Sequence, residues 1–115
     1  MKHTAEIPKW LLNSLSNIYQ LKLKAKRKGF YDDIERDITK LEENYAECGL
    51  FIHDPLGEKC PDTRTDVEVN IAGSGGDNLV IIDVIKPIIR QSSSNLTASQ
   101  AVVVQKGIVV AESQK

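Results

Sequence analysis

The chain has 115 residues, a formal net charge of −1, few aromatics, and an apolar content made up mainly of Ile, Val, Leu and Ala. This length allows one domain with a modest core and is small for two independent domains. No N-terminal apolar run is long enough for a signal peptide or a membrane span, and only two cysteines occur, Cys48 and Cys60. We therefore expect a reducing, cytoplasmic setting.

The near-neutral net charge hides an asymmetry along the chain. Residues 1–28 hold seven Lys/Arg against one Glu, a net of +6, and residues 29–115 hold eight Lys/Arg against fifteen Asp/Glu, a net of −7; together these give the −1 of the whole chain. Such a split suits self-association or an oriented charged partner at least as well as nucleic acid.

The first predicted element is an amphipathic helix that begins near Pro8, a residue suited to a first helical turn. Its apolar residues recur at steps of three and four and so form one stripe: Ile7, Leu11, Leu15 and Ile18. A basic run then precedes Gly29, and we expect a solvated helix end there rather than a phosphate-binding surface, because no aromatic residues are interleaved with it. The run consists of Lys22, Lys24, Lys26, Arg27 and Lys28.

A second amphipathic helix is predicted after Gly29. Asp32 and Asp33 suit its N-terminal end, where the dipole favours negative charge, and Gly49 can take the left-handed conformation that closes a helix. Its apolar stripe comprises Phe30, Ile34, Ile38, Leu41, Tyr45 and Cys48.

Two helices joined by a short loop form a helical hairpin over residues 1–49, and each helix has a stripe to bury. We therefore expect two copies to pair into a four-helix bundle, which makes the protein a homodimer. The expected dimer interface is Leu11, Leu15, Ile18, Ile34, Ile38, Leu41 and Tyr45.

From Leu50 onward the period changes from helical to strand spacing. Thr65 to Ile71 alternates apolar and polar residues, as a half-buried strand does, and residues 79–85 read as a longer strand that Pro87 ends. The glycine-rich residues 73–78 predict a hairpin loop and residues 90–95 a polar loop, and residues 50–52, 101–104 and 108–110 are shorter strand candidates. The fold class is thus α+β, with a small antiparallel β-domain over residues 50–115.

No catalytic set is apparent in the sequence. The histidines, cysteines and carboxylates are scattered rather than paired as nucleophile and base, and Cys48, His53 and Cys60 lack the close spacing of zinc ligands. The glycine-rich stretch is followed by a strand rather than a helix, which disfavours a nucleotide-binding loop. We expect no enzyme activity, no cofactor, no metal, no small-molecule substrate and no membrane association.

The order of these parts resembles the GrpE family, the nucleotide-exchange cochaperones of DnaK-type ATPases. The likeness spans roughly residues 7 to 110 and identifies a short, divergent relative that lacks the family's long N-terminal helix. It is carried by Gly29-x4-Ile34-x3-Ile38-x2-Leu41-Glu42, Gly49-Leu50-Phe51, Asp54-Pro55-Leu56-Gly57-Glu58, Val80-Ile81-Ile82-Asp83-Val84-Ile85-Lys86-Pro87 and Ala101-Val102-Val103-Val104.

The resemblance implies a dimeric cochaperone whose β-domain projects as a wing and binds the ATPase domain of a DnaK-type chaperone, so that ADP leaves. It further implies that Gly49 acts as a hinge between wing and bundle, and that Lys86 and Arg90 are exposed charges. The implied partner-binding residues are Ile85, Lys86, Pro87, Ile88, Arg90 and Asn95. Two alternatives stay open: a dimeric scaffold or adaptor that uses the wing on an unrelated protein, and a non-specific nucleic-acid binder that uses the basic run.

Overall fold

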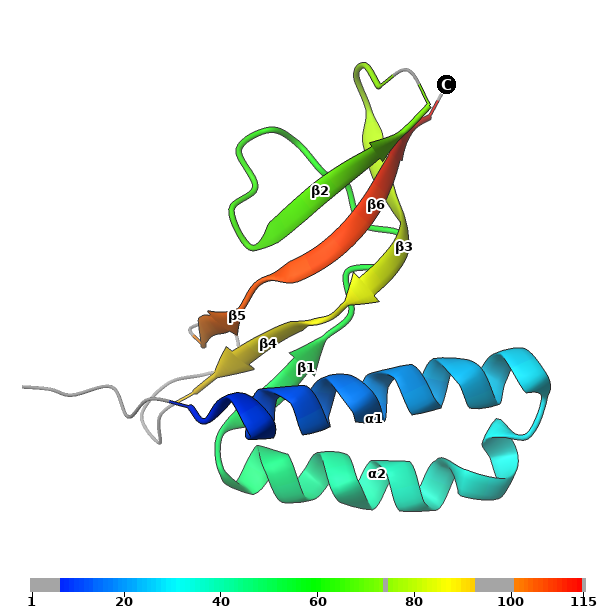
Figure 1. Cartoon of the computed structure of the whole chain (residues 1–115), viewed down its shortest axis with the longest axis vertical. Coiled ribbons are helices and arrows are strands. Elements are labelled where there is room, and N and C mark those ends of the chain that lie inside the picture. The colour runs from blue at the N-terminus through cyan, green and yellow to red at the C-terminus, as the bar shows by residue number, and fades with distance from the viewer. Residues whose placement is uncertain (1–6, 74, 93–100, 115) are drawn as a thin grey trace, which may run out of the picture. The chain divides into compact units, whose positions relative to one another are not determined.

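The computed structural model describes residues 7–73, 75–92 and 101–114. The chain divides into two compact units, Met1–Cys48 and Gly49–Lys115, which we call the helical unit and the β-unit. Two helices come first and all strands follow, which confirms the α+β class (Figure 1). Within the described residues, neither helix is long and apolar enough to cross a membrane.

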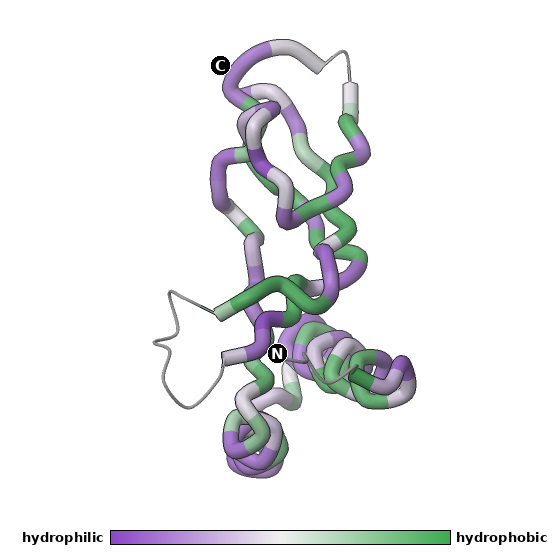
Figure 2. Tube along the Cα trace, turned by 90° about the vertical axis from the view of Figure 1, so that its left-hand side faces the viewer, coloured by the Kyte–Doolittle hydropathy of each residue, from purple (hydrophilic) through white to green (hydrophobic). Residues whose placement is uncertain are grey.

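The helical unit consists of α1 (Lys9–Lys28) and α2 (Tyr31–Glu47). Helix α1 starts directly after Pro8, whose carbonyl accepts from the amide of Leu11 at 3.0 Å. It ends at Gly29, where φ is 84° and the amide of Phe30 donates back to the carbonyl of Ala25 at 3.0 Å. This is the glycine-closed helix end that the sequence predicts. Both helices mix hydrophobic and hydrophilic residues along their length (Figure 2).

The two helices contact each other through polar as well as apolar side chains. The hydroxyls of Ser14 and Tyr45 lie 2.6 Å apart, and the ammonium of Lys22 lies 3.2 Å from a carboxylate oxygen of Glu42. The pairing of Ser14 with Tyr45 fixes the orientation of a residue from each helix, because a hydroxyl pair bonds only over a short distance.

Several residues of the predicted apolar stripes are buried in a single chain. Leu15 and Ile38 are each 1% exposed and Ile18 is 8% exposed, whereas Leu41 stays 40% exposed. Leu15, Ile18 and Ile38 are therefore already buried without a second copy. Helix α1 buries more than its stripe, since Ser16, Tyr19 and Ala25 are also buried.

The described residues of the β-unit form six strands in two sheets of three (Figure 1). One sheet has the order β1 (Leu50–His53), β4 (Ile88–Gln91), β5 (Val102–Gln105), and the other has the order β2 (Val67–Ala72), β6 (Gly107–Ser113), β3 (Leu79–Lys86). Strand β6 pairs parallel to β2 and antiparallel to β3, so the expectation of a purely antiparallel β-domain is wrong.

The predicted hairpin over residues 73–78 is also wrong, because β2 and β3 are not paired with each other. Strand β6 lies between them, with Val109 and Ala111 both fully buried. Strand β6 is thus covered on both edges by neighbours, which buries these two small apolar residues. The glycine-rich connection reverses the chain without joining adjacent strands.

Strand β3 ends just before Pro87, as the sequence predicts, but β4 follows directly and extends through Arg90 and Gln91, so the predicted polar loop is wrong for these two residues. Both Ile88 and Ile89 are 0% exposed. Strands β3 and β4 belong to different sheets. The first part of the outer edge of β3, Leu79 to Ile81, is covered by the segment 57–60: Ile81 donates to Glu58, and its carbonyl accepts from Gly57, both at 2.9 Å. A covered edge cannot pair with a further strand.

Gly49 and Gly57 allow a matched test of backbone strain in the β-unit. Both have positive φ, 81° and 85°, but an added Cβ at Gly57 meets nothing, whereas one at Gly49 would overlap the carbonyl oxygen of Ser92. We expect Gly57→Ala to cost about 1 kcal/mol in the free energy of unfolding. Gly49→Ala should cost roughly 2 to 4 kcal/mol, because overpacking adds to strain. Equal losses in urea unfolding would contradict this account.

Candidate functional site

The described residues among those predicted to bind a partner lie between Ile85 and Arg90. The structure divides them into accessible, buried and ion-paired residues. Ile85 is 52% exposed and Lys86 is half-buried at the end of β3. Pro87 and Ile88 are buried, so their prediction as partner contacts is wrong in this conformation: they are core residues. Asn95 lies outside the described residues.

The exposure of Ile85 results from an irregularity in β3. Its pairing with β6 shifts register between Ile81 and Asp83 and again between Val84 and Lys86. Each shift inserts one extra residue, and the two inserted residues are Ile82 and Ile85. Such β-bulges aim a side chain away from the position that simple alternation gives it.

These bulges keep the core residues Ile81 and Val84 buried while they leave Ile82 44% and Ile85 52% exposed. We call the exposed run of Ile82, Asp83, Ile85 and Lys86 the bulge surface. It presents two large apolar side chains beside one negative and one positive charge. Sequence reasoning placed Ile85 and Lys86 here but missed Ile82, because strict alternation does not foresee two bulges within one strand.

Arg90 is not the freely solvated charge that the sequence suggests. Its guanidinium lies 3.1 Å from a carboxylate oxygen of Asp66, and its Nε donates to Nδ1 of His53 at 3.2 Å. A charge reversal at Arg90 would therefore place two carboxylates together. Arg90→Glu is expected to destabilise the β-unit.

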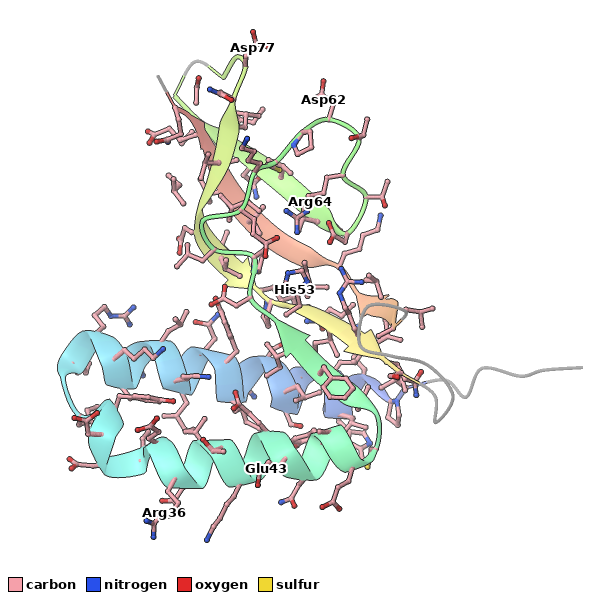
Figure 3. The ribbon with its side chains drawn as sticks, turned by 180° about the vertical axis from the view of Figure 1, so that it is seen from behind. Arg36, Glu43, His53, Asp62, Arg64 and Asp77 are labelled. Atoms are coloured by element: carbon pink, nitrogen blue, oxygen red, sulfur yellow. The ribbon has the colours of Figure 1, made fainter. Side chains whose placement is uncertain are left out.

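Arg90 belongs to a closed ring of five side chains, which we call the ionic ring: His53, Glu58, Arg64, Asp66 and Arg90. Arg64 bridges the two carboxylates, at 2.7 Å to Glu58 and 2.6 Å to Asp66. Nε2 of His53 lies 2.8 Å from Glu58 and completes the ring. Figure 3 shows His53 and Arg64 close together in the β-unit.

The ring fixes the tautomer of His53. Nε of Arg90 can only donate, so Nδ1 of His53 must accept, and Nε2 then carries the hydrogen that it donates to Glu58. With a neutral histidine the two guanidinium charges balance the two carboxylates. The ring connects β1 and β4 to the segment that leads into β2. It therefore links one sheet of the β-unit to the segment that precedes the other.

The acidity of the ring carboxylates follows from these contacts. Hydrogen bonds from Arg64 lower the pKa of Asp66 despite the opposing effect of burial. For Glu58 burial raises the pKa, but the bonds from His53 and Arg64 outweigh it, so that the pKa is lowered overall. These contacts also raise the pKa of Arg64, chiefly through Asp66. The ring is therefore ionised and internally satisfied at neutral pH.

The described residues offer limited means for bond-making chemistry. Burial raises the pKa of the Cys60 thiol, which keeps it protonated and a poor nucleophile. Within residues 7–73, 75–92 and 101–114 no three His, Cys, Asp or Glu side chains come together as a metal site would require. An open depression of about 320 Å³ next to Cys60 contains Lys59 together with Asp62 and Asp77, so an ion of either sign would meet a like charge there.

The basic run at the end of α1 is only partly available to an anionic partner. Lys22 pairs with Glu42, and the ammonium of Lys26 lies 5.0 Å from the centre of the Tyr31 ring in a cation–π contact. Lys24, Arg27 and Lys28 are exposed. Nothing in this arrangement resembles a groove that follows a phosphate backbone.

The ionic ring predicts a pH dependence of stability. Since the pKa values of Glu58 and Asp66 are lowered from 4.5 and 3.8, their contribution is complete above these ordinary values and is lost as the pH falls through the folded-state values. Thermal unfolding followed from about pH 6 to about pH 3 should show a falling melting temperature. Arg64→Gln should melt lower at about pH 6 but lose less on acidification. An equal acid loss in both proteins would contradict the assignment.

Comparison with protein-family models, with curated proteins and with solved structures finds no match to this chain. The function proposed next therefore rests on the residues and the geometry described above.

Proposed function

We propose that this chain is a GrpE-like nucleotide-exchange cochaperone, which binds the ATPase domain of a cytoplasmic DnaK-type chaperone through the β-unit and promotes ADP release. The observation that carries the proposal is the bulge surface. At the place where the resemblance puts the partner contact, two β-bulges leave Ile82 and Ile85 exposed. Large exposed apolar side chains beside charged ones are typical of a protein-binding surface.

Exchange of this kind needs no chemistry from the cochaperone. If the β-unit binds the open form of an ATPase domain more tightly than the closed form, it raises the population of the open form, and ADP dissociates faster from that form. A tenfold preference for the open form amounts to about 1.4 kcal/mol of differential binding energy. A few apolar contacts centred on Ile82 and Ile85 are enough to supply this amount.

The ionic ring supports this function by making the β-unit rigid. A rigid surface loses little conformational entropy on binding, so more of the contact energy appears as preference for one conformation of the partner. Arg90 thus acts as a residue that positions β4 within the β-unit, rather than as a partner contact. Gly49 as a hinge remains part of the proposal.

A homodimer through the helical unit is the second part of the proposal. Three of the expected interface residues are already buried, which leaves Leu41 exposed and Leu11, Ile34 and Tyr45 half-buried as positions that a second copy could cover. A dimer seam on these residues would be narrower than the full stripes predict. Oligomers formed through such self-complementary faces are commonly two-fold symmetric.

The dimer is tested by Leu41→Asp. Leu41 is 40% exposed, so the charge should leave the fold of one chain intact while it disrupts a seam between two copies. Analytical ultracentrifugation at micromolar concentration should show a self-associated wild-type protein whose mass Leu41→Asp lowers by about half or more. The control is Thr39→Asp, an exposed position on α2 that lies about 200° around the helix from Leu41. Ile38→Asp is unsuitable because Ile38 is core. A monomeric wild-type protein would contradict the dimer.

The binding surface is tested by Ile85→Asp combined with Lys86→Glu, with Arg90 left unchanged. We expect a loss of roughly 2 kcal/mol in binding, about 30-fold in affinity, together with loss of accelerated ADP release from a DnaK-type ATPase. The matched control is Arg27→Glu with Lys28→Glu, which changes two exposed charges in the basic run.

The outcomes distinguish the functional alternatives. Loss of binding in the control but not in the bulge-surface variant would move the site to the basic run. Salt-dependent binding to nucleic acid would then indicate the non-specific nucleic-acid binder. A wild-type protein that leaves ADP release unchanged would exclude the exchange function. In that case a dimeric scaffold or adaptor that uses the same surface would be the remaining reading.

A further inference from the structure

Strand β2 has an outer edge that no other described segment pairs with. It stands at the end of the β2-β6-β3 sheet (Figure 1), and its ladder runs to β6 alone. Among the described residues, the backbone hydrogen bonds outside helices and strands do not involve any residue from Val67 to Ala72. At the opposite edge of this sheet, residues 57–60 cover the first part of β3, from Leu79 to Ile81.

The backbone direction at this edge follows from a single hydrogen bond. The amide of Gly107 donates to the carbonyl of Asp66 at 3.0 Å, and Val67 is opposite Gly107 in the parallel register. Backbone groups of successive strand residues point alternately to the two sides, so Asp66, Glu68 and Asn70 bond toward β6. The N–H and C=O groups of Val67, Val69 and Ile71 therefore point outward to the free edge.

The side chains of these residues are the apolar ones. Val69 and Ile71 are 38% and 53% exposed, although they share a sheet face with Val109 and Ala111, which are fully buried. On this face the side chains of β6 are buried, whereas Val69 and Ile71 on the edge strand β2 are not. From Val67 to Ala72 the strand has no lysine, no proline and no bulge, which are three common edge-blocking devices, and Glu68 is its one charged residue.

We propose that a second copy of this chain pairs antiparallel with β2 across a two-fold axis at Val69. In this register Val69 faces Val69 of the other copy, and Val67 faces Ile71. All three residues direct their backbone groups outward, so each facing pair exchanges two hydrogen bonds. The two β2-β6-β3 sheets become one continuous sheet.

The charges of β2 fit this register. Glu68 faces Asn70 of the second copy, whose side-chain amide also donates to the Val109 carbonyl of its own chain at 3.4 Å, and no like charges face each other. A shift that placed Glu68 opposite Glu68 would bring two carboxylates together. A shift by one residue would put inward-bonding groups opposite outward ones, so that no ladder forms. A register centred on Asn70 would place Val67 opposite Gly73, so the register at Val69 is the one that pairs all three outward apolar residues with one another. This interface is separate from the helical one.

Disulfide cross-linking tests the register directly. In a Cys48→Ser background, which removes the exposed native thiol, Val69→Cys places two thiols opposite each other at a Cα separation of about 5.5 Å, within disulfide reach. We expect a disulfide-linked dimer on mild oxidation. Ile71→Cys in the same background is the matched control. Position 71 is more exposed than position 69, but it faces position 67, so the dimer band should be lost.

Val69→Pro provides a second measurement that is independent of thiol chemistry. The amide of Val69 points outward, so proline removes no hydrogen bond to β6 and the fold should persist by circular dichroism. We expect the sedimentation mass to fall by about half or more relative to wild type, whether or not the helical units also pair.

Each outcome supports or overturns the proposal. Cross-linking at position 69 but not 71, with the loss of mass in Val69→Pro, supports it. Cross-linking at both positions shows random collision, cross-linking at neither shows that the edge stays unpaired, and an unchanged mass in a folded Val69→Pro protein overturns it as well. No chaperone is present in these experiments, so their result does not depend on the exchange function.

Discussion

The β-unit depends on the placement of its last strand, β6, between β2 and β3. Val109 and Ala111 are fully buried in this central strand, and Gly107 starts it where an added Cβ would press on a side-chain atom of Ile88 at 2.9 Å. Strands β2 and β3 therefore obtain a ladder partner only from β6, which follows both of them in the chain. Long-range pairing of this kind is costly in loop-closure entropy, and the buried apolar residues of β6 offset that cost.

This arrangement also accounts for both exposed apolar surfaces of the sheet. Pairing β3 with a shorter run of β6 requires two bulges, and these expose Ile82 and Ile85. Placing β2 on the other side of β6 makes it an edge strand, which exposes Val69 and Ile71. The two surfaces differ in the chemistry that they offer. The bulge surface presents side chains alone, whereas the β2 edge presents backbone hydrogen-bonding groups as well.

The ionic ring links strands of the β1-β4-β5 sheet, to which β6 does not belong, to the connection before β2. It brings together His53 on β1, Arg90 on β4 and three residues from the connection before β2. Each of its members satisfies a neighbour, so none is free to act as an isolated base or ligand. This explains why a set of residue types that could suggest catalysis serves instead to order the β-unit, and why the candidate binding surface lies on apolar residues beside it.

Local signals in the sequence determined the secondary structure. Some sequence features fix a backbone geometry within a few residues, so they can be predicted without knowledge of the fold. These are the steps of three and four in the helices, Pro8 before α1, the glycines at 29 and 49, and Pro87 at the end of β3. The sequence also identified Ile85 as a candidate contact. It did not determine the strand order, the bulge at Ile82, or the ring around Arg90, and it placed Pro87 and Ile88 on the surface when they are core. Those features depend on contacts between residues far apart in the chain, such as Asp66 with Arg90 or Val67 with Gly107. Local periodicity carries no information about such contacts, and only the tertiary structure decided them.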